Sequence, residues 1–346
     1  MAFGTDKFAS PGALRMALAF AVFVHHTTAF NLGMSAVLIF FVLSGYWVAT
    51  MWNKTYSKTS LSYFTFLVSR LWRVAPVFAL CSGIAWALLW WRGQAPEFAG
   101  SLAGVAHQLF SNVLILGYNS LTYQANVPGW SLDMEMQFYL VAPVVIFLVS
   151  RNVLALLGCV ALSLVAPRFG GAATVLPFLY FFGIGVAAAT HELAPSRRLA
   201  YGSLIATFAL LLVYAALYFK AFAADPSQHQ LLAFSSKANL LIAVMMTPWA
   251  IYTTKQKSGA TDRMFGDLSY IFYLLHWSVI GALGTGEGSY ADRFVLCAEA
   301  VVVIMVISWL IWLLFDRPIG RVRASWVSGR RLMDEPAGVA IAAMPA

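Results

Sequence analysis

The chain has 346 residues, of which 61% are hydrophobic and 10% are charged, and its formal net charge is +8. A soluble domain is about 45–50% apolar and about 25% charged, so this composition excludes an ordinary soluble protein. The three cysteines lie singly inside apolar blocks, which argues against a disulfide framework and against a metal site built on cysteines. We therefore expect an integral membrane protein.

The apolar residues come in blocks separated by short polar or basic breaks. This pattern predicts an all-α fold, a polytopic transmembrane helix bundle, because helices satisfy their backbone hydrogen bonds inside a bilayer. Ser10 and Pro11 mark the start of the first helix. The segment 104–118 is only weakly apolar and is predicted as a partial or interfacial helix. We predict about ten spans, at residues 13–30, 34–52, 74–91, 130–149, 152–166, 174–190, 199–219, 231–253, 267–284 and 294–315.

Basic residues are unevenly distributed between the two sides of this topology. With the N-terminus inside, all lysines and arginines fall in inner breaks except five, which are Arg92, Arg168, Lys220, Lys237 and Arg293. The positive-inside rule then places both termini in the cytoplasm. It also explains the net charge without invoking nucleic acid.

The first predicted span, "ALRMALAFAVFVHHTTAF", carries an arginine and two histidines. Arg15 and His26 are eleven positions apart, about three helical turns, so they share one face at a separation of roughly 16 Å. His25 points about 100° away from that face. Ionisable residues within a span are functional candidates by default. The structural alternatives are a snorkelling topogenic charge for Arg15 and a core histidine for His26.

Two further arginines stand three apart in "SRLWRVAP", residues 69–76. Arg70 and Arg73 should share one face at the cytoplasmic side, in a segment that Pro76 ends. Two guanidinium groups at one place suit a phosphate, although inside-positive topology explains them equally well.

The segment "WSLDMEMQFYL", residues 130–140, follows the longest outer connection, 92–129, whose polar and aromatic residues suit sugar-like groups. Trp130 is predicted as an outer interfacial anchor. Glu135 then lies about 7–8 Å further in, at a depth similar to that of His26, so a contact between them is open. A carboxylate beside an imidazole orients the ring and raises its basicity, and the alternative is a structural polar pair. Asp133 should face elsewhere, nearer the outer surface.

Near the end of the chain, "LSYIFYLLHWSV", residues 268–279, combines an aromatic stripe with a histidine. Tyr270, Tyr273 and Trp277 lie on one helical face, which more often serves packing than a site. His276 falls near the middle of the membrane and is harder to explain by packing.

Six segments, taken together and in order, resemble acyltransferase family 3, the bacterial membrane-bound acyltransferases. Arg15 and His26 fit the Arg-x10-His pattern of its first helix. The other segments are "FFVLSGY" (40–46), "SRLWRVAP", "WSLDMEMQFYL", "LSYIFYLLHW" and "FDRPIG" (315–320), which is similar to a closing acid-x-Pro motif. The resemblance covers residue 14 to about residue 320, as a stand-alone type without a soluble esterase-like domain. Leu38 stands where members often carry a polar or acidic residue.

The resemblance implies transfer of an acyl group, usually acetyl, from cytoplasmic acyl-CoA to a hydroxyl group of a carbohydrate. The acceptor would be a surface polysaccharide, its lipid-linked precursor or a small glycosylated metabolite. Carried over by position, His26 and Glu135 would be catalytic, and Arg15, Arg70 and Arg73 would bind the donor. The residues expected to bind the acceptor or line the site are Ser44, Trp130, Gln137, Tyr139, Tyr270, Tyr273 and His276. His26 would act as a general base or carry the acyl group itself.

No permanently bound cofactor and no metal are expected, and acyl-CoA is a co-substrate. The expected surroundings are the bacterial cytoplasmic membrane, with polysaccharide-assembly proteins or a second copy of the chain as open partners. We expect residues 1–320 to form the transmembrane acyltransferase domain and residues 321–346 a basic, then disordered, cytoplasmic tail. The competing function is a transporter or flippase of lipid-linked sugars, which ten spans and polar residues at the midplane would also fit.

Overall fold

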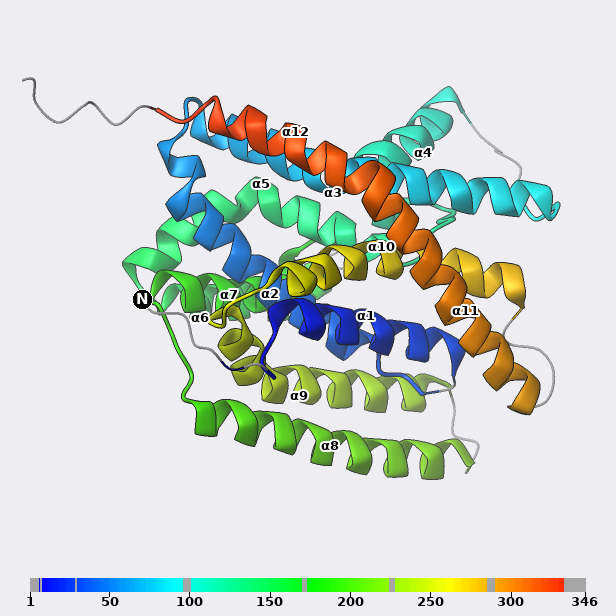
Figure 1. Ribbon diagram of the computed structural model, residues 1–346. Coiled ribbons are helices and arrows are strands. Elements are labelled where there is room, and N and C mark those ends of the chain that lie inside the picture. The colour runs from blue at the N-terminus through cyan, green and yellow to red at the C-terminus, as the bar shows by residue number, and fades with distance from the viewer. Residues whose placement is uncertain are drawn as a thin grey trace, which may run out of the picture.

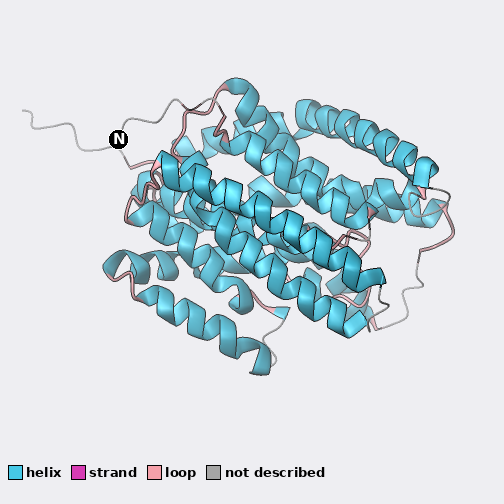
Figure 2. Ribbon diagram, turned by 90° about the horizontal axis from the view of Figure 1, so that it is seen from below, coloured by secondary structure: helices cyan, strands magenta, loops and turns pink. Residues whose placement is uncertain are grey.

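The computed structural model describes residue 6 and residues 8–28, 30–95, 101–169, 173–223, 228–284 and 290–332. Within these ranges the fold is helical, and an isolated β bridge joins Thr59 to Arg331 (Figures 1 and 2). The α-helices are α1 (Pro11–Thr27), α2 (Gly33–Lys54), α3 (Ser62–Trp91), α4 (Leu102–Leu114), α5 (Gly129–Arg151), α6 (Ala155–Val165), α7 (Leu179–Thr190), α8 (Arg197–Ala223), α9 (Gln228–Thr254), α10 (Ala260–Leu283), α11 (Tyr290–Ile311) and α12 (Arg317–Ser328).

Five segments of the described chain are long and apolar enough to cross a membrane. They are Gly33–Lys58, Ser62–Trp91, Gly129–Arg151, Arg197–Lys220 and Phe294–Ser328. The predicted helical class is confirmed, whereas the count of ten spans and the sides of the termini stay predictions. α4 has 13 residues, about 20 Å at 1.5 Å per residue, which is too short to cross a hydrocarbon core of about 30 Å.

The third helix differs from the prediction at its start. α3 begins at Ser62 rather than near residue 74, and Pro76 lies inside it instead of ending the segment before it. Pro76 has no N–H group to donate to the preceding turn, which usually weakens a helix in water. A packed membrane bundle tolerates such a residue because neighbouring helices hold the segment in place. Arg70 and Arg73 therefore project from the interior of one continuous helix.

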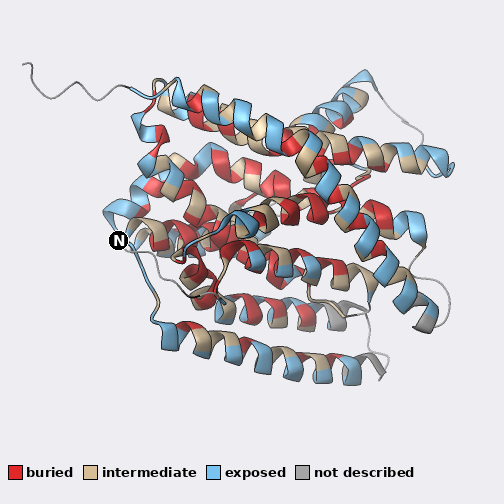
Figure 3. Ribbon diagram, viewed as in Figure 1, coloured by how far each residue is buried: buried red, intermediate tan, exposed pale blue. Residues whose placement is uncertain are grey.

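α2 is the central helix, since it contacts α1, α5, α7 and α9. Its contact with α7 is a backbone contact at two glycines. A Cβ atom at Gly45 would collide with the carbonyl oxygen of Phe182, and one at Gly185 would collide with that of Val42. Small residues let membrane helices approach in this way. Buried residues accordingly gather on α2, α7 and the adjoining faces of α5 and α10, whereas α8 is largely exposed (Figure 3).

α1 and α10 form a parallel pair. At their N-terminal ends, the carboxylate of Asp262 accepts hydrogen bonds from the backbone N–H groups of Gly12, at 2.8 Å, and Ala13, at 3.0 Å. A carboxylate at this position satisfies the free amides of α1 and complements its dipole. Towards their C-terminal ends, His26 lies against His276. The pair thus keeps one register from end to end.

The connection before α5 is buried in the bundle. The carboxylate of Asp133 accepts hydrogen bonds from the backbone amides of Gly117, at 3.1 Å, and Asn119, at 2.8 Å. Tyr118 and Asp133 are almost completely buried. Trp130 packs against Phe41 and Phe178 and is partly buried, and its predicted role as an interfacial anchor stays a prediction. Asp133 therefore faces the interior and not the outer surface.

The last helices form one long run with an irregular turn. A π-helical turn, Trp312–Asp316, joins α11 to α12. α12 packs on α3, where the Trp326 and Trp72 rings are 5.8 Å apart. The first part of the predicted tail is therefore helical as far as Ser328, and residues 333–346 lie outside the described residues.

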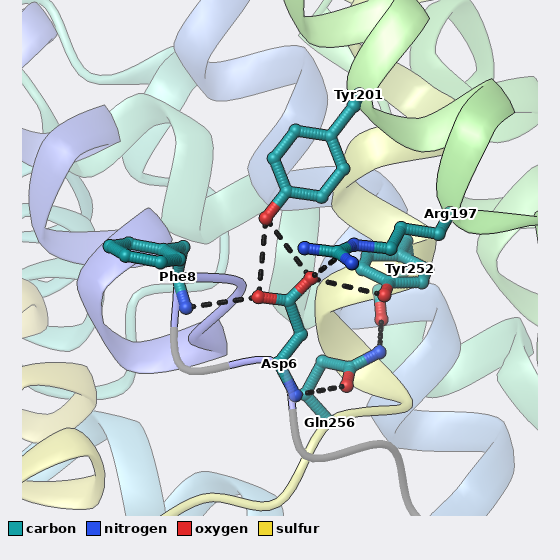
Figure 4. A network of polar contacts seen from close by, with 6 residues as sticks. All are labelled: Asp6, Phe8, Arg197, Tyr201, Tyr252 and Gln256. Carbon is teal, nitrogen blue, oxygen red and sulfur yellow. Dashed lines mark hydrogen bonds and ion pairs between the residues drawn. The ribbon is translucent and has the colours of Figure 1, made fainter.

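An acidic residue before α1 ties the N-terminal segment to α8 and α9 (Figure 4). The Asp6 carboxylate accepts hydrogen bonds from the Tyr201 hydroxyl, at 3.0 Å, and the Tyr252 hydroxyl, at 3.2 Å, and pairs with Arg197 at 3.3 Å. The Asp6 amide donates to the side chain of Gln256. These contacts fix the approach of the chain to its first helix.

Candidate active site

A cavity of about 200 Å³ lies between α1, α2, α3, α5 and α10. We call it the arginine cavity, because Arg15, Arg70 and Arg73 all line it. Its wall on α2 extends from Val48 to Val37, about 16 Å at 1.5 Å per residue. Its other lining residues are Phe40, Phe41, Leu43, Ser44, Trp47, Val74, Ser131, Leu132, Glu135, Tyr139, Ser269, Tyr270 and Tyr273. The structure thus brings together the three arginines that the sequence predicted as one group.

Arg73 is held by acids of its own protein. Its guanidinium group lies 2.6 Å from an oxygen of Asp267 and 3.9 Å from an oxygen of Asp316. The indole N–H of Trp312 also donates to Asp267, at 3.4 Å. Asp316 belongs to the motif "FDRPIG", whose π-helical turn delivers it to this place. Arg73 is therefore already neutralised before any ligand binds.

Arg70 has a different environment, although it lies only one turn away. Its guanidinium carbon is 5.6 Å from the ring centre of Tyr56 and 5.8 Å from those of Phe66 and Tyr139. Such cation–π contacts stabilise a cation without neutralising it. Its Nε atom is buried, and no hydrogen-bond partner or carboxylate reaches it among the described residues. Arg70 therefore stays available to an anionic ligand, unlike Arg73.

Glu135 lies in the arginine cavity and not beside His26. Its carboxylate accepts hydrogen bonds of 2.6 Å from Ser44 on α2 and 2.6 Å from Tyr139 on α5. Among the described residues, no hydrogen bond or ion pair joins Glu135 to His26. The predicted contact between them is wrong because α5 begins deeper in the bundle than its sequence suggested, so Glu135 falls at the level of Ser44.

Two tyrosines of α10 form the opposite wall of the cavity. The Tyr270 hydroxyl donates to the carbonyl of Val74 at 2.8 Å, and the Tyr273 hydroxyl is 2.8 Å from the Ser131 hydroxyl. Both side chains are therefore held by neighbouring helices. Ser131 was not singled out in the sequence, where one serine in an apolar helix carries no distinguishing signal.

Two other predicted site residues lie outside the cavity lining. Trp130 packs between aromatic rings, as described above. The side chain of Gln137 donates to Asp133 at 3.0 Å and accepts from the amide of Val175 at 2.9 Å. Gln137 thus ties the buried connection to the segment before α7. Gln137 does not line the arginine cavity, whereas Tyr139, two residues further along α5, does.

The histidine cluster consists of His25, His26, His276 and Trp277. The ring of His26 lies 4.7 Å from His25, 5.2 Å from His276 and 5.0 Å from Trp277, between ring centres. His276 is completely buried, whereas His26 is partly exposed. No group of three or more His, Cys, Asp or Glu residues in the described ranges could hold a metal ion. The cluster lies one turn beyond Tyr273, which lines the end of the arginine cavity.

A second cavity, of about 590 Å³, adjoins the first and shares Arg15 and Trp47 with it. We call it the basic vestibule, because Lys54, Lys257 and Arg263 also line it. Its two acids are Asp262, which caps α1, and Asp267, which is paired with Arg73. The sequence identified these lysines and Arg263 only as topogenic charges. Their convergence depends on how the ends of α2, α9 and α10 meet.

The model of a protein family described as an acyltransferase domain matches residues 8–313. No curated protein and no solved structure gave a significant match. The matched range includes the arginine cavity, the basic vestibule and the histidine cluster. It also contains all but the last of the motifs on which the resemblance was based. The chain therefore belongs to acyltransferase family 3, the family of membrane-bound acyltransferases.

Proposed function

We propose that the protein transfers an acyl group, acetyl in the first instance, from acyl-CoA to a hydroxyl group of a carbohydrate. The observation that supports this best is the pair of adjoining cavities. They form a cationic path from the basic vestibule, past Arg15, into the arginine cavity and towards the histidine cluster. A donor with an anionic nucleotide end and an acyl group on a long arm has this distribution of charge.

The donor end of the proposal depends on cations that form no ion pair with a carboxylate among the described residues. Lys54, Lys257 and Arg263 would face the phosphates in the vestibule, and Arg70 would meet an anionic or polar part of the arm further in. Charge-assisted hydrogen bonds to phosphate are strong, and a guanidinium group can make two of them at once. Arg73 would support the cavity wall through its ion pairs with Asp267 and Asp316 rather than bind the donor.

The acyl end of the proposal depends on His26. The cavity wall ends at Val37 and Tyr273, one turn from the level of His26 and His276. In the transfer, the acceptor oxygen forms a bond to the acyl carbon, the bond from that carbon to sulfur breaks, and the hydroxyl proton ends on the thiolate. His26 would carry that proton, or would carry the acyl group between the two substrates. Either route needs an imidazole within reach of both substrates.

A direct test uses the purified protein in lipid nanodiscs with acetyl-CoA and a panel of glycosides. We expect CoA release that depends on a glycoside, together with a glycoside product heavier by one acetyl group in mass spectrometry. A transporter would move sugar without releasing CoA. If CoA release were absent or independent of every glycoside, the proposed donor and acceptor classes would be wrong.

The acceptor can be sought in cells at the same time. Surface glycans from cells with and without the gene are compared by mass spectrometry, and loss of acetyl groups upon deletion is the expected result. An unchanged glycan profile would contradict a surface polysaccharide as acceptor.

A further inference from the structure

His276 has one nitrogen whose hydrogen-bonding role is fixed and one that has no partner. Its Nδ1 atom lies 2.7 Å from the carbonyl oxygen of Tyr273. A carbonyl oxygen can only accept, so Nδ1 must carry the proton. In the neutral ring, Nε2 is then an unprotonated acceptor. That atom is completely buried and has no hydrogen-bond partner in the described protein.

An unpartnered acceptor in this place calls for a ligand. Leaving a buried polar atom unsatisfied costs roughly 1–3 kcal/mol, and proteins keep few such atoms without a role. Within a membrane helix the cost is retained mainly where the group has a function. A leucine at position 276 would avoid it altogether. The missing partner must be a hydrogen-bond donor, because the fixed tautomer leaves Nε2 only a lone pair.

The neighbouring histidine is not that donor. The rings of His26 and His276 are close to parallel, with an interplanar angle of 28°. The rings are stacked, and no hydrogen bond joins Nε2 of His276 to His26. The Glu135 carboxylate lies in the arginine cavity, where Ser44 and Tyr139 hold it. Nothing else among the described residues donates to Nε2.

We propose that Nε2 of His276 accepts a hydrogen bond from the acceptor hydroxyl when this group lies against His26. The assignment rests on the proposed function, whose acceptor is a sugar hydroxyl. It makes His276 an acceptor-binding residue that orients the attacking oxygen, while His26 takes part in the transfer. Tyr273 acts as a positioning residue, because its carbonyl fixes the tautomer of His276 while its ring lines the arginine cavity.

The first test does not need acyl transfer. The protein is labelled with ¹⁵N at its histidine nitrogens and studied by NMR in lauryldimethylamine oxide micelles, with His276 assigned from the signals lost in His276→Gln. We expect a protonated Nδ1 and an unprotonated Nε2. Addition of octyl β-D-glucoside should shift the Nε2 signal, because its sugar hydroxyls can donate. A reversed tautomer, or an Nε2 signal indifferent to the glucoside, would overturn the proposal.

The second test separates acceptor binding from a structural role. His276→Leu removes the acceptor atom, and His276→Gln offers an amide oxygen near the same place. We expect His276→Leu to raise the glycoside KM about tenfold with the acetyl-CoA KM within twofold, and His276→Gln to raise it less. A structural role would lower thermal stability and would change both KM values alike, or neither.

His25→Gln is the matched control, since His25 also touches the ring of His26 and also has a buried nitrogen without a partner, Nδ1, but lies on the α2 side, beside Gly33. We expect its glycoside KM to stay within threefold of the wild-type value. An equal effect of both histidine variants would mean that only the ring stacking matters, which contradicts the proposal. If the wild type transfers no acyl group to any glycoside, the proposed function fails, while the NMR experiment still decides the role of Nε2.

Discussion

The arginine cavity and the histidine cluster lie along the same pair of parallel helices, yet they are built in opposite ways. The cavity is hollow and charged, and its cations are held apart by acids and aromatic rings. The cluster is filled by its own rings and contains no carboxylate. One region keeps a cation without a counter-charge, Arg70, and the other keeps a nitrogen lone pair without a donor, on His276. An anionic ligand would supply the counter-charge for Arg70. A ligand with a hydroxyl group would supply the hydrogen-bond donor for His276.

The histidine cluster should carry the larger effect on the rate. We expect His26→Ala to reduce acyl transfer at least about 100-fold, because a positioned proton-transfer group contributes roughly 10²–10⁴-fold. The measurement is CoA release in nanodiscs, with size-exclusion chromatography to show that the variant is folded. His25→Ala is the control and should keep most of the activity. Near-wild-type transfer by His26→Ala would remove the cluster from the chemistry.

The arginine cavity should affect the donor rather than the rate. We expect Arg70→Gln to raise the acetyl-CoA KM about tenfold, the equivalent of about 1.4 kcal/mol, because it removes the unpaired cation. The glycoside KM and the melting temperature should change little. An unchanged donor KM would mean that Arg70 serves topology and aromatic packing only.

Arg73→Gln should instead lower stability, which separates two arginines that the sequence presents as equivalent. The variant leaves Asp267 and Asp316 without their partner. Breaking a fully buried pair costs about 3–5 kcal/mol and an exposed pair about 0–1 kcal/mol. The Arg73 side chain is 25% exposed and that of Asp316 is 8% exposed, so we expect a loss of roughly 1–3 kcal/mol.

The measurement is the melting temperature in detergent, with Arg73→Gln compared to Arg70→Gln. The double variant Arg73→Gln with Asp267→Asn should recover part of the loss. Equal melting temperatures for the two single variants would contradict the distinction between a structural and a ligand-binding arginine.

Glu135→Gln tests whether the two regions are electrostatically separate. If Glu135 oriented His26, removal of its charge would shift the pH dependence of transfer. Because Glu135 is bonded to Ser44 and Tyr139 instead, we expect the shape of the pH–rate profile to stay unchanged. A clear shift of the pH–rate profile would instead support a contact between Glu135 and His26.

The smallest effect should come from outside both regions, at Asp6. Burial by itself would raise the pKa of Asp6, but hydrogen bonds from the Phe8 amide, Tyr201 and Tyr252 and the charge of Arg197 lower it below its ordinary value of 3.8. A lowered pKa in the folded state means that ionised Asp6 stabilises the fold above pH 3.8 and that this contribution is lost as the pH falls below it.

We therefore expect Asp6→Asn to melt slightly below the wild type at neutral pH. The difference should shrink as both proteins are acidified below pH 3.8. Transfer activity should be unaffected, since Asp6 lies outside the two cavities and the histidine cluster. A difference in melting temperature that does not depend on pH would argue against ionisation of Asp6 as its source.

The sequence predicted those features that are local. Apolar blocks predicted helices, and the spacing of Arg15 and His26 predicted that both residues lie on one helix, as they do on α1. The grouping of Arg15, Arg70 and Arg73 followed from their common side of the bundle. The placement of Glu135 failed because it assumed that α5 begins at the membrane surface. Asp133 draws the preceding connection into the bundle through two backbone amides, and no periodicity in the sequence records that kind of contact.

The different environments of Arg70 and Arg73 could also not be predicted from the sequence. They share a motif and a helical face, and only the partners on α10 and in the π-helical turn tell them apart. Likewise, the basic vestibule forms only where the ends of three helices, α2, α9 and α10, meet. Long-range assembly of this kind requires the packed structure.

The π-helical turn at Trp312–Asp316 has a consequence for how the end of the chain tolerates insertions and deletions. A π turn winds more residues into each turn than the 3.6 of an α-helix, so it shifts the angular phase between α11 and α12. Deleting one residue there together with a return to regular winding would leave the phase of α12 nearly unchanged, whereas the same return at an unchanged chain length would rotate α12 by about 100°. Trp326 would then leave Trp72, and Asp316 would point away from Arg73. The π turn thus absorbs one extra residue while keeping the orientation of α12, so the winding and the chain length at this point are constrained together.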